Sequence, residues 1–113
     1  MPGPMRGDVW LVELSPTRGH EQSGTRPAIV VSVDGFNLGP AGLVVVVPLT
    51  TKERRVALHV RIEPPEAGLR STSFAMCEAV RSISKDRLVA RWGASEPATM
   101  AEIEDRLRAL VGV

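Results

Sequence analysis

Two continuous apolar runs constrain most strongly how this chain can fold. They span residues 27–33 and 43–49, are rich in β-branched side chains, and are bounded by Gly, Pro or Asn. A strand that is apolar on both faces has to be covered on both faces. We therefore expect these runs to be buried strands within two packed layers or a closed barrel.

Further strand patterns lie on either side of these runs. Residues 8–14 are short and apolar, residues 56–62 alternate between apolar and polar side chains, and residues 73–83 and 88–92 predict one longer and one shorter strand. The alternation places His59 on the polar face of its strand, where we expect a structural or incidental role. Residues 84–88 predict a helical turn, and residues 64–68 a tight turn.

The last segment changes to a helical period. Its apolar stripe predicts a helix that docks on the sheet and ends at Gly112, and Thr99 with Glu102 has the spacing of a capping box. The stripe consists of Met100, Ile103, Leu107, Leu110 and Val111. Many short strands with Gly/Pro turns and one terminal helix predict a mainly β fold, either a small barrel or a sandwich.

Length and composition narrow the classes of function. The 113 residues, 43% of them hydrophobic, fit one domain over residues 6–113 behind a short leader at residues 1–5. A net charge of +1 excludes nucleic-acid binding through bulk charge but leaves a local patch open. The single Cys77 is compatible with a reducing cytoplasm, and no apolar run approaches membrane-spanning length. One Cys and two distant His residues lack the spacing of a metal site.

The kind of basic residue is informative as well. Lys52 and Lys85 are the only lysines, and every other basic side chain is Arg. Arg forms bidentate contacts with phosphate, although a GC-rich coding sequence explains the same bias equally well. The segment 16–27 combines Arg18, Arg26 and His20 with two glycines between predicted strands. Such a loop can hold a phosphodiester and move a proton beside it, and a solvated turn is the alternative.

Several motifs resemble the MazF/PemK (Kid) family of toxins, and the resemblance covers residues 6–111. The longest and most specific is the segment from Ser15 to Pro27, preceded by Arg6-Gly7-Asp8-Val9-Trp10. The later motifs follow in the family's order: Val47-Pro48-Leu49-Thr50-Thr51, Gly68-Leu69-Arg70-Ser71-Thr72 and Glu78-Ala79-Val80-Arg81-Ser82-Ile83.

This resemblance implies an SH3-like β-barrel with a C-terminal helix and a cytoplasmic homodimer. It also implies a sequence-specific, ribosome-independent endoribonuclease that cuts single-stranded RNA and is neutralised by a cognate antitoxin. RNA supplies its own nucleophile, the 2′-hydroxyl, so the expected chemistry needs neither a metal nor another cofactor. The expected cleavage products are a 2′,3′-cyclic phosphate and a 5′-hydroxyl end.

The resemblance also assigns catalytic residues. Arg26 matches the family's essential arginine and is expected to stabilise the phosphorane, and Thr50 matches its essential threonine. Glu78 and His20 are both candidates for the general base, and the choice between them stays open. For Glu78, the lone acid on its predicted strand face, a structural ion pair with Arg26 or Arg81 is an equal alternative.

Residues for RNA binding are expected in three places. They are Arg18, Glu21 and Gln22 in the first loop, Thr51, Lys52, Arg54 and Arg55 after Thr50, and Phe36 with Asn37 after the second strand. Phe36 serves equally well as a core residue, and Trp10 and Trp92 are expected in the core or a dimer interface.

Two departures from the family pattern keep other functions open. Met76 stands where PemK-like members carry a catalytic Arg, and Ala79 where relatives commonly carry Gln. The alternatives are a protein-binding relative of the same barrel, such as the gyrase-poisoning toxins, and an inactive regulator that binds antitoxin. The polar loop at residues 16–27 argues against the first.

Overall fold

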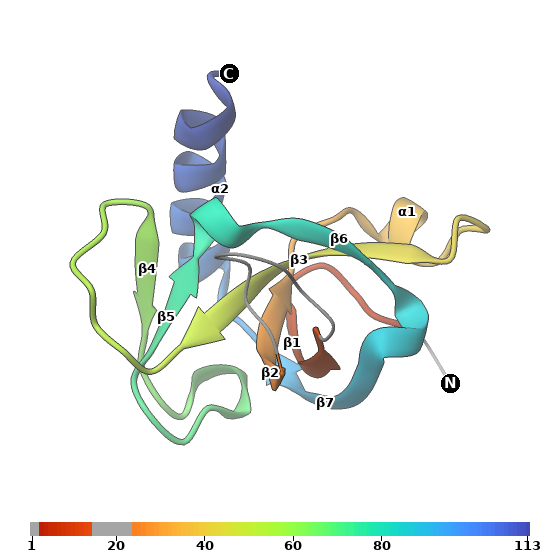
Figure 1. Ribbon diagram of the computed structural model, residues 1–113, viewed down its shortest axis with the longest axis horizontal. Helices are drawn as coiled ribbons and strands as arrows, with labels where there is room; N and C mark the ends of the chain where they lie inside the picture. Colours follow the sequence, from red (N-terminus) through yellow and green to blue (C-terminus); the bar gives the residue numbers. More distant parts are fainter. Residues whose placement is uncertain (1–2, 15–23) are drawn as a thin grey trace.

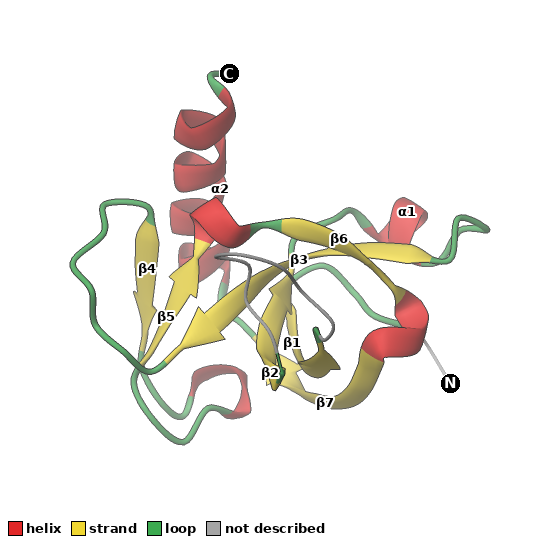
Figure 2. Ribbon diagram, in the orientation of Figure 1, coloured by secondary structure: helices red, strands yellow, loops and turns green. Residues whose placement is uncertain are grey.

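A computed structural model of the chain describes residues 3–14 and 24–113. Figures 1 and 2 show a β structure with one long helix on its outside. The strands are β1 (Asp8–Glu13), β2 (Thr25–Val30), β3 (Leu43–Thr50), β4 (His59–Ile62), β5 (Ser73–Met76), β6 (Arg81–Ser84) and β7 (Leu88–Ala94). The helices are α1 (Asp34–Asn37) and α2 (Pro97–Val111), with short 3-10 turns η1 (Glu66–Gly68), η2 (Cys77–Ala79) and η3 (Lys85–Arg87).

The strands form one antiparallel sheet in the order β4-β5-β3-β2-β1-β7, and β6 also pairs with β3. β3 crosses the middle of the molecule in Figure 1. One edge of β3 pairs with β2, and the other pairs first with β6 and then with β5. Among the described strands no pairing joins β4 to β7, so the sheet stays open there, and η1 packs against β7 instead. The expected mainly β fold with a C-terminal helix is confirmed.

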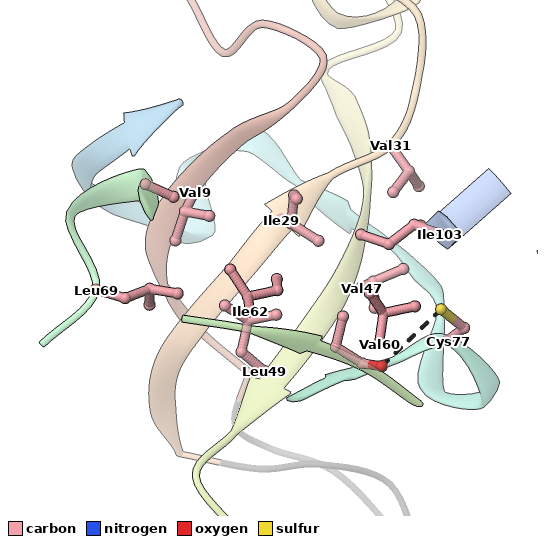
Figure 3. Close-up of a cluster of buried hydrophobic side chains, with 12 residues drawn as sticks. Val9, Ile29, Val31, Val47, Leu49, Val60, Ile62, Leu69, Cys77 and Ile103 are labelled. Atoms are coloured by element: carbon pink, nitrogen blue, oxygen red, sulfur yellow. Dashed lines mark hydrogen bonds between the residues drawn. The ribbon is translucent and has the colours of Figure 1, made fainter. Parts of the chain in front are cut away.

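The two apolar runs are buried on both faces, as their sequences predict. Ile29 and Val47 belong to one core cluster, whereas Val30 and Val46 belong to a second cluster. Figure 3 shows the first cluster, with Val9, Ile29, Val47, Leu49, Val60 and Ile62 gathered between the strands and Ile103 reaching it from α2. Successive residues of β2 and β3 therefore alternate between two cores.

The predicted strand over residues 73–83 is interrupted. η2 separates β5, which pairs with β4 and the end of β3, from β6, which pairs with the start of β3. The predicted face shared by Phe74, Met76, Glu78 and Val80 is therefore wrong, because the turn at 77–79 breaks the two-residue period. The break lets the chain leave one stretch of β3 and rejoin another.

Helix α2 docks through Met100, Ile103 and Leu107, as the sequence predicts, but Leu110 and Val111 of the predicted stripe are exposed. The helix also begins earlier than expected. Its first residue is Pro97, a residue favoured at that position, and no side chain caps its N-terminus. The expected capping box is therefore wrong, and Thr99 is buried within the first turn. The end is as predicted: Gly112 adopts the left-handed conformation with φ of 78°. None of the described helices is long and apolar enough to cross a membrane.

Removing the side chain by which α2 docks should destabilise the fold. Ile103 is fully buried in the first core cluster, so Ile103→Ala is expected to cost about 2–5 kcal/mol of unfolding free energy. Leu110→Ala on the exposed side of the same helix is the matched control and should cost within about 0.5 kcal/mol. Urea denaturation followed by circular dichroism measures both, and equal effects would contradict this docking.

Cys77 should be chemically inert in the folded protein. It is buried at the end of β5, and burial raises the pKa of its thiol to about 11, so the reactive thiolate is scarce at neutral pH. We expect slow alkylation by iodoacetamide at pH 7.5 and rapid alkylation once the chain is unfolded in guanidinium, both followed by mass spectrometry. Equal rates in the two states would show that Cys77 is accessible.

Candidate active site

A pocket of about 270 Å³ lies where β2 begins and β3 ends. The antiparallel register explains its composition. Ala28 lies opposite Pro48, so continuing the same pairing by two residues brings Arg26 beside Thr50. The pocket is lined by Arg26, Pro27, Leu49, Thr50, Thr51, Lys52 and Ser73. Two residues predicted to be catalytic, 24 positions apart in the chain, thus share one pocket.

Arg26 presents a cation to this pocket. Its Nη1 donates a long hydrogen bond of 3.5 Å to the carbonyl of Leu49, and its Nε is buried with no hydrogen-bond partner among the described residues. Within the described part of the chain Arg26 forms no salt bridge, so no carboxylate neutralises its charge there. A half-buried guanidinium in this state is prepared to bind an anion, because phosphate oxygens match its planar set of donors.

Thr50 has a defined hydroxyl orientation. Its Oγ1 accepts a hydrogen bond of 3.2 Å from the backbone N–H of Lys52, which leaves the hydroxyl proton as a donor toward a ligand. Thr51 and Lys52 are exposed on the rim of the same pocket. Ser73 is buried beneath it and donates its hydroxyl to the carbonyl of Ser71 over 3.0 Å. The pocket therefore offers a cation, an oriented hydroxyl and an amine around one small space.

Glu78 does not line this pocket. Thr50 pairs with Phe74, and Glu78 follows four residues later in η2, beyond the end of β5. Its carboxylate instead lies 2.7 Å from Nε2 of His59. The His59 side chain is only 5% exposed, and its Nδ1 is buried with no partner in the described part of the chain. Of the two ion pairs proposed for Glu78, neither the one with Arg26 nor the one with Arg81 is present.

Sequence reasoning missed the His59–Glu78 pair. His59 lies on the polar face of β4, as the alternation predicts, and contacts η2 because β4 pairs with β5, where His59 lies opposite Met76. The sequence contained one signal for this pair, a histidine and an acid on two consecutive predicted strands. Their partnership depends on the register, which a single sequence does not supply.

The expected RNA contacts divide into three groups. Lys52, Arg54 and Arg55 are exposed on the loop between β3 and β4, and none of them pairs with an acid of the described segments. Phe36 and Asn37 lie in α1, after the other end of β2, and do not line the pocket. The residues His20, Arg18, Glu21 and Gln22 lie outside the described residues.

The structure gives Asn37 a different role from the predicted contact with a base. Its side chain is fully buried, with Nδ2 donating 2.9 Å to the carbonyl of Ser32 and Oδ1 accepting from the Ser32 hydroxyl. Both ends of the amide are therefore occupied inside the protein. Phe36, the neighbouring residue, is partly exposed and is therefore not a core residue.

Comparison with known proteins gives the family. A model of the PemK-like, MazF-like toxins of type II toxin–antitoxin systems matches residues 5–111. Endoribonuclease MazF9 of Mycobacterium tuberculosis is 34% identical over 108 residues, which cover 91% of this chain and 92% of that protein. Endoribonuclease MazF of Staphylococcus epidermidis is 30% identical over 109 residues, covering 96% and 91%.

Solved structures agree with this assignment. MazF from Deinococcus radiodurans superposes with a TM-score of 0.86 at 27% identity and covers 98% of both chains. A mycobacterial endoribonuclease in complex with its cognate antitoxin gives a TM-score of 0.81 at 28% identity, covering 97% of this chain and 96% of that one. The chain therefore belongs to the PemK-like, MazF-like toxin family of type II toxin–antitoxin systems.

Proposed function

We propose that this toxin is an endoribonuclease that cuts single-stranded RNA at a specific sequence, without the ribosome and without a metal. The observation that carries the proposal is the pocket that joins the guanidinium of Arg26, which pairs with no acid of residues 3–14 and 24–113, to the hydroxyl of Thr50. The endoribonucleases among its relatives support it. A gyrase-poisoning toxin or an inactive regulator has no need of this pair.

The chemistry follows from what RNA supplies. The 2′-oxygen attacks the neighbouring phosphorus and loses its proton to a base, while the bond from phosphorus to the 5′-oxygen breaks and that oxygen takes up a proton. The products are a 2′,3′-cyclic phosphate and a 5′-hydroxyl end. Arg26 stabilises the negative charge of the phosphorane, and the Thr50 hydroxyl donates a hydrogen bond to a phosphate oxygen. A preorganised donor of this kind contributes roughly 10²–10³-fold to the rate.

The general base is one of two residues. His20 precedes Arg26 in the motif at residues 15–27, and Glu78 contacts His59 outside the pocket. Glu78 acts as the base only if bound RNA or a second subunit extends the site to η2. A carboxylate in contact with an imidazole is chemically suited to accept a proton and pass it on. Either choice leaves the roles of Arg26 and Thr50 unchanged.

The remaining parts of the proposal concern partners. Thr51 and Lys52 on the rim, with Arg54 and Arg55 farther along the same exposed loop, contact the RNA backbone through polar and positively charged side chains. We further propose that residues 6–113 act as one domain, that the toxin forms a homodimer in the cytoplasm, and that a cognate antitoxin neutralises it. A related endoribonuclease that was solved with its cognate antitoxin supports the last point.

Variants of the two pocket residues should lower cleavage without affecting folding. Arg26→Ala and Thr50→Val each remove a donor to the phosphorane, so we expect kcat/KM to fall on the order of 100-fold or more. Thr50→Ser keeps the hydroxyl and should retain most of the activity. A fluorogenic RNA that contains the mapped cut site provides the rate, and circular dichroism verifies the fold.

Arg108→Ala is the matched control, because Arg108 is an exposed cation on α2 outside the pocket. Its activity should equal that of the original chain. Full activity in Arg26→Ala would remove the central assignment of this site.

The nucleophile and the metal requirement are tested together. With EDTA present, cleavage should continue at an unchanged rate, and a single 2′-deoxy substitution at the cut position should abolish it. Mass spectrometry of the fragments should show the cyclic phosphate and the 5′-hydroxyl end. Cleavage of the 2′-deoxy substrate would exclude attack by the 2′-hydroxyl, and loss of activity in EDTA would exclude the metal-independent mechanism.

A further inference from the structure

Trp92 occupies an unusual position in the sheet. β7 pairs with β1 so that Arg91 lies opposite Trp10 and Gly93 lies opposite Val9, which leaves Trp92 as an extra residue in a β-bulge. Bulges change the direction of a side chain and are common beside functional sites. Trp92 is 39% exposed, whereas Trp10 packs against the second core cluster. Trp10 therefore packs against the core, as expected, whereas Trp92 lies outside the core. The other position expected for Trp92, a dimer interface, stays a prediction.

The backbone around the bulge is tightly fixed. A Cβ on Gly68 would lie 2.4 Å from the carbonyl oxygen of Trp92, and a Cβ on Gly93 would lie 2.8 Å from the carbonyl carbon of Ala67. Gly68 also has a φ of +74°, which side-chain-bearing residues rarely adopt. η1 and β7 therefore approach so closely that a Cβ fits at neither glycine. This contact holds the exposed indole on a rigid support.

The indole borders a groove that continues from the Arg26–Thr50 pocket. Trp92, Leu69, Arg70 and Ser71 line a hollow of about 180 Å³ together with Pro27, Thr51 and Ser73. Those last three residues also line the pocket of Arg26 and Thr50. On its other side, Trp92 lines a further hollow of about 400 Å³ with Gly68, Arg70 and Arg91. Each hollow shares lining residues with the next, so the two hollows and the pocket form one continuous groove that starts at the candidate active site.

The charge of this groove is positive. Arg70 is exposed and has no salt bridge within the described segments, and Arg91 bonds Asp8 over 3.1 Å while half of its side chain stays exposed. Among the described residues, none that lines either hollow is acidic. An exposed aromatic face between guanidinium groups binds unpaired bases through stacking and the adjoining phosphates through charge. Single-stranded nucleic acid fits both features at once.

We propose that Trp92 and Arg70 form a subsite for one nucleotide of single-stranded RNA next to the scissile phosphate. The base stacks on the indole of Trp92, and Arg70 contacts the phosphate that links this nucleotide to the cut position. The subsite rests on the proposed function, since it is the neighbouring pocket that holds the phosphate. Stacking tolerates every base, so Trp92 contributes affinity and positioning more than sequence discrimination.

RNA binding measures the proposal directly. The ligand is an RNA with the mapped cut site, made resistant by one 2′-deoxy substitution, and its Kd is measured by fluorescence anisotropy. Trp92→Ala should weaken binding by about tenfold, and Trp92→Phe should restore most of the affinity because it keeps an aromatic face. Val89→Ala is the matched control, since Val89 is the extra, exposed residue of the second bulge in β7. Its Kd should equal that of the original chain.

Abasic substitution identifies the nucleotide concerned. Bases on either side of the cut position are removed one at a time, and the original chain should lose affinity at one flanking position. Trp92→Ala should show no further loss at that position and normal losses at the others. The subsite is wrong if Trp92→Ala loses affinity equally at every abasic position. It is also wrong if Trp92→Ala keeps its Kd for RNA but sediments with less than the dimer mass, which would indicate a structural or interface role.

Cleavage of unmodified RNA separates this proposal from the one on which it rests. Trp92→Ala should raise KM about tenfold and leave kcat nearly unchanged, because stacking is made equally in the ground and transition states. If the original chain cleaves RNA and Trp92→Ala matches it in KM and in Kd, the subsite is wrong and the proposed function stands. If the original chain cleaves no RNA, the proposed function fails and the subsite fails with it.

Discussion

The pairing of β3 along both of its edges is the interaction on which the rest of the structure depends. β2 pairs with one edge of β3, while β6 and β5 share the other edge. β3 is therefore the strand that connects the two halves of the sheet. Its side chains enter two separate cores, with Val47 in one and Val46 in the other. A strand used in this way has to be apolar throughout its middle, and the β-branched run of β3 meets that requirement. The same arrangement forces the chain to turn at η2 between β5 and β6.

The candidate site is a consequence of this pairing. Antiparallel strands place the start of one beside the end of the other, which brings Arg26 at the start of β2 to Thr50 at the end of β3. The pocket therefore lies at the margin of the sheet, where side chains reach solvent while the strands hold their backbone in place. The open edge between β4 and β7 is bridged by η1, and this contact also supports Trp92. The candidate active site and the proposed subsite thus share one framework.

Much of the fold follows from local patterns, and the failures have specific physical causes. The apolar runs, the helical stripe and Gly112 predict their elements correctly, because burial and backbone freedom leave few alternatives. The strand predicted over residues 73–83 was too long. Nothing local in its sequence reveals that its two halves, β5 and β6, pair with different stretches of β3. The capping box failed because Pro97 starts α2 one turn early. Asn37, expected at the surface, satisfies its amide on Ser32 inside the protein.

The sequence by itself determined the buried strands and the terminal helix, and its motifs predicted Arg26 and Thr50 as site residues. These features depend on side-chain type and short spacing, which a single chain displays directly. Tertiary structure alone decided which distant residues meet. It paired Glu78 with His59 and kept it outside the pocket, and it directed Trp92 outward through a one-residue bulge. Register and bulges decide such contacts, and a shift of one residue moves a side chain to the opposite face of the sheet.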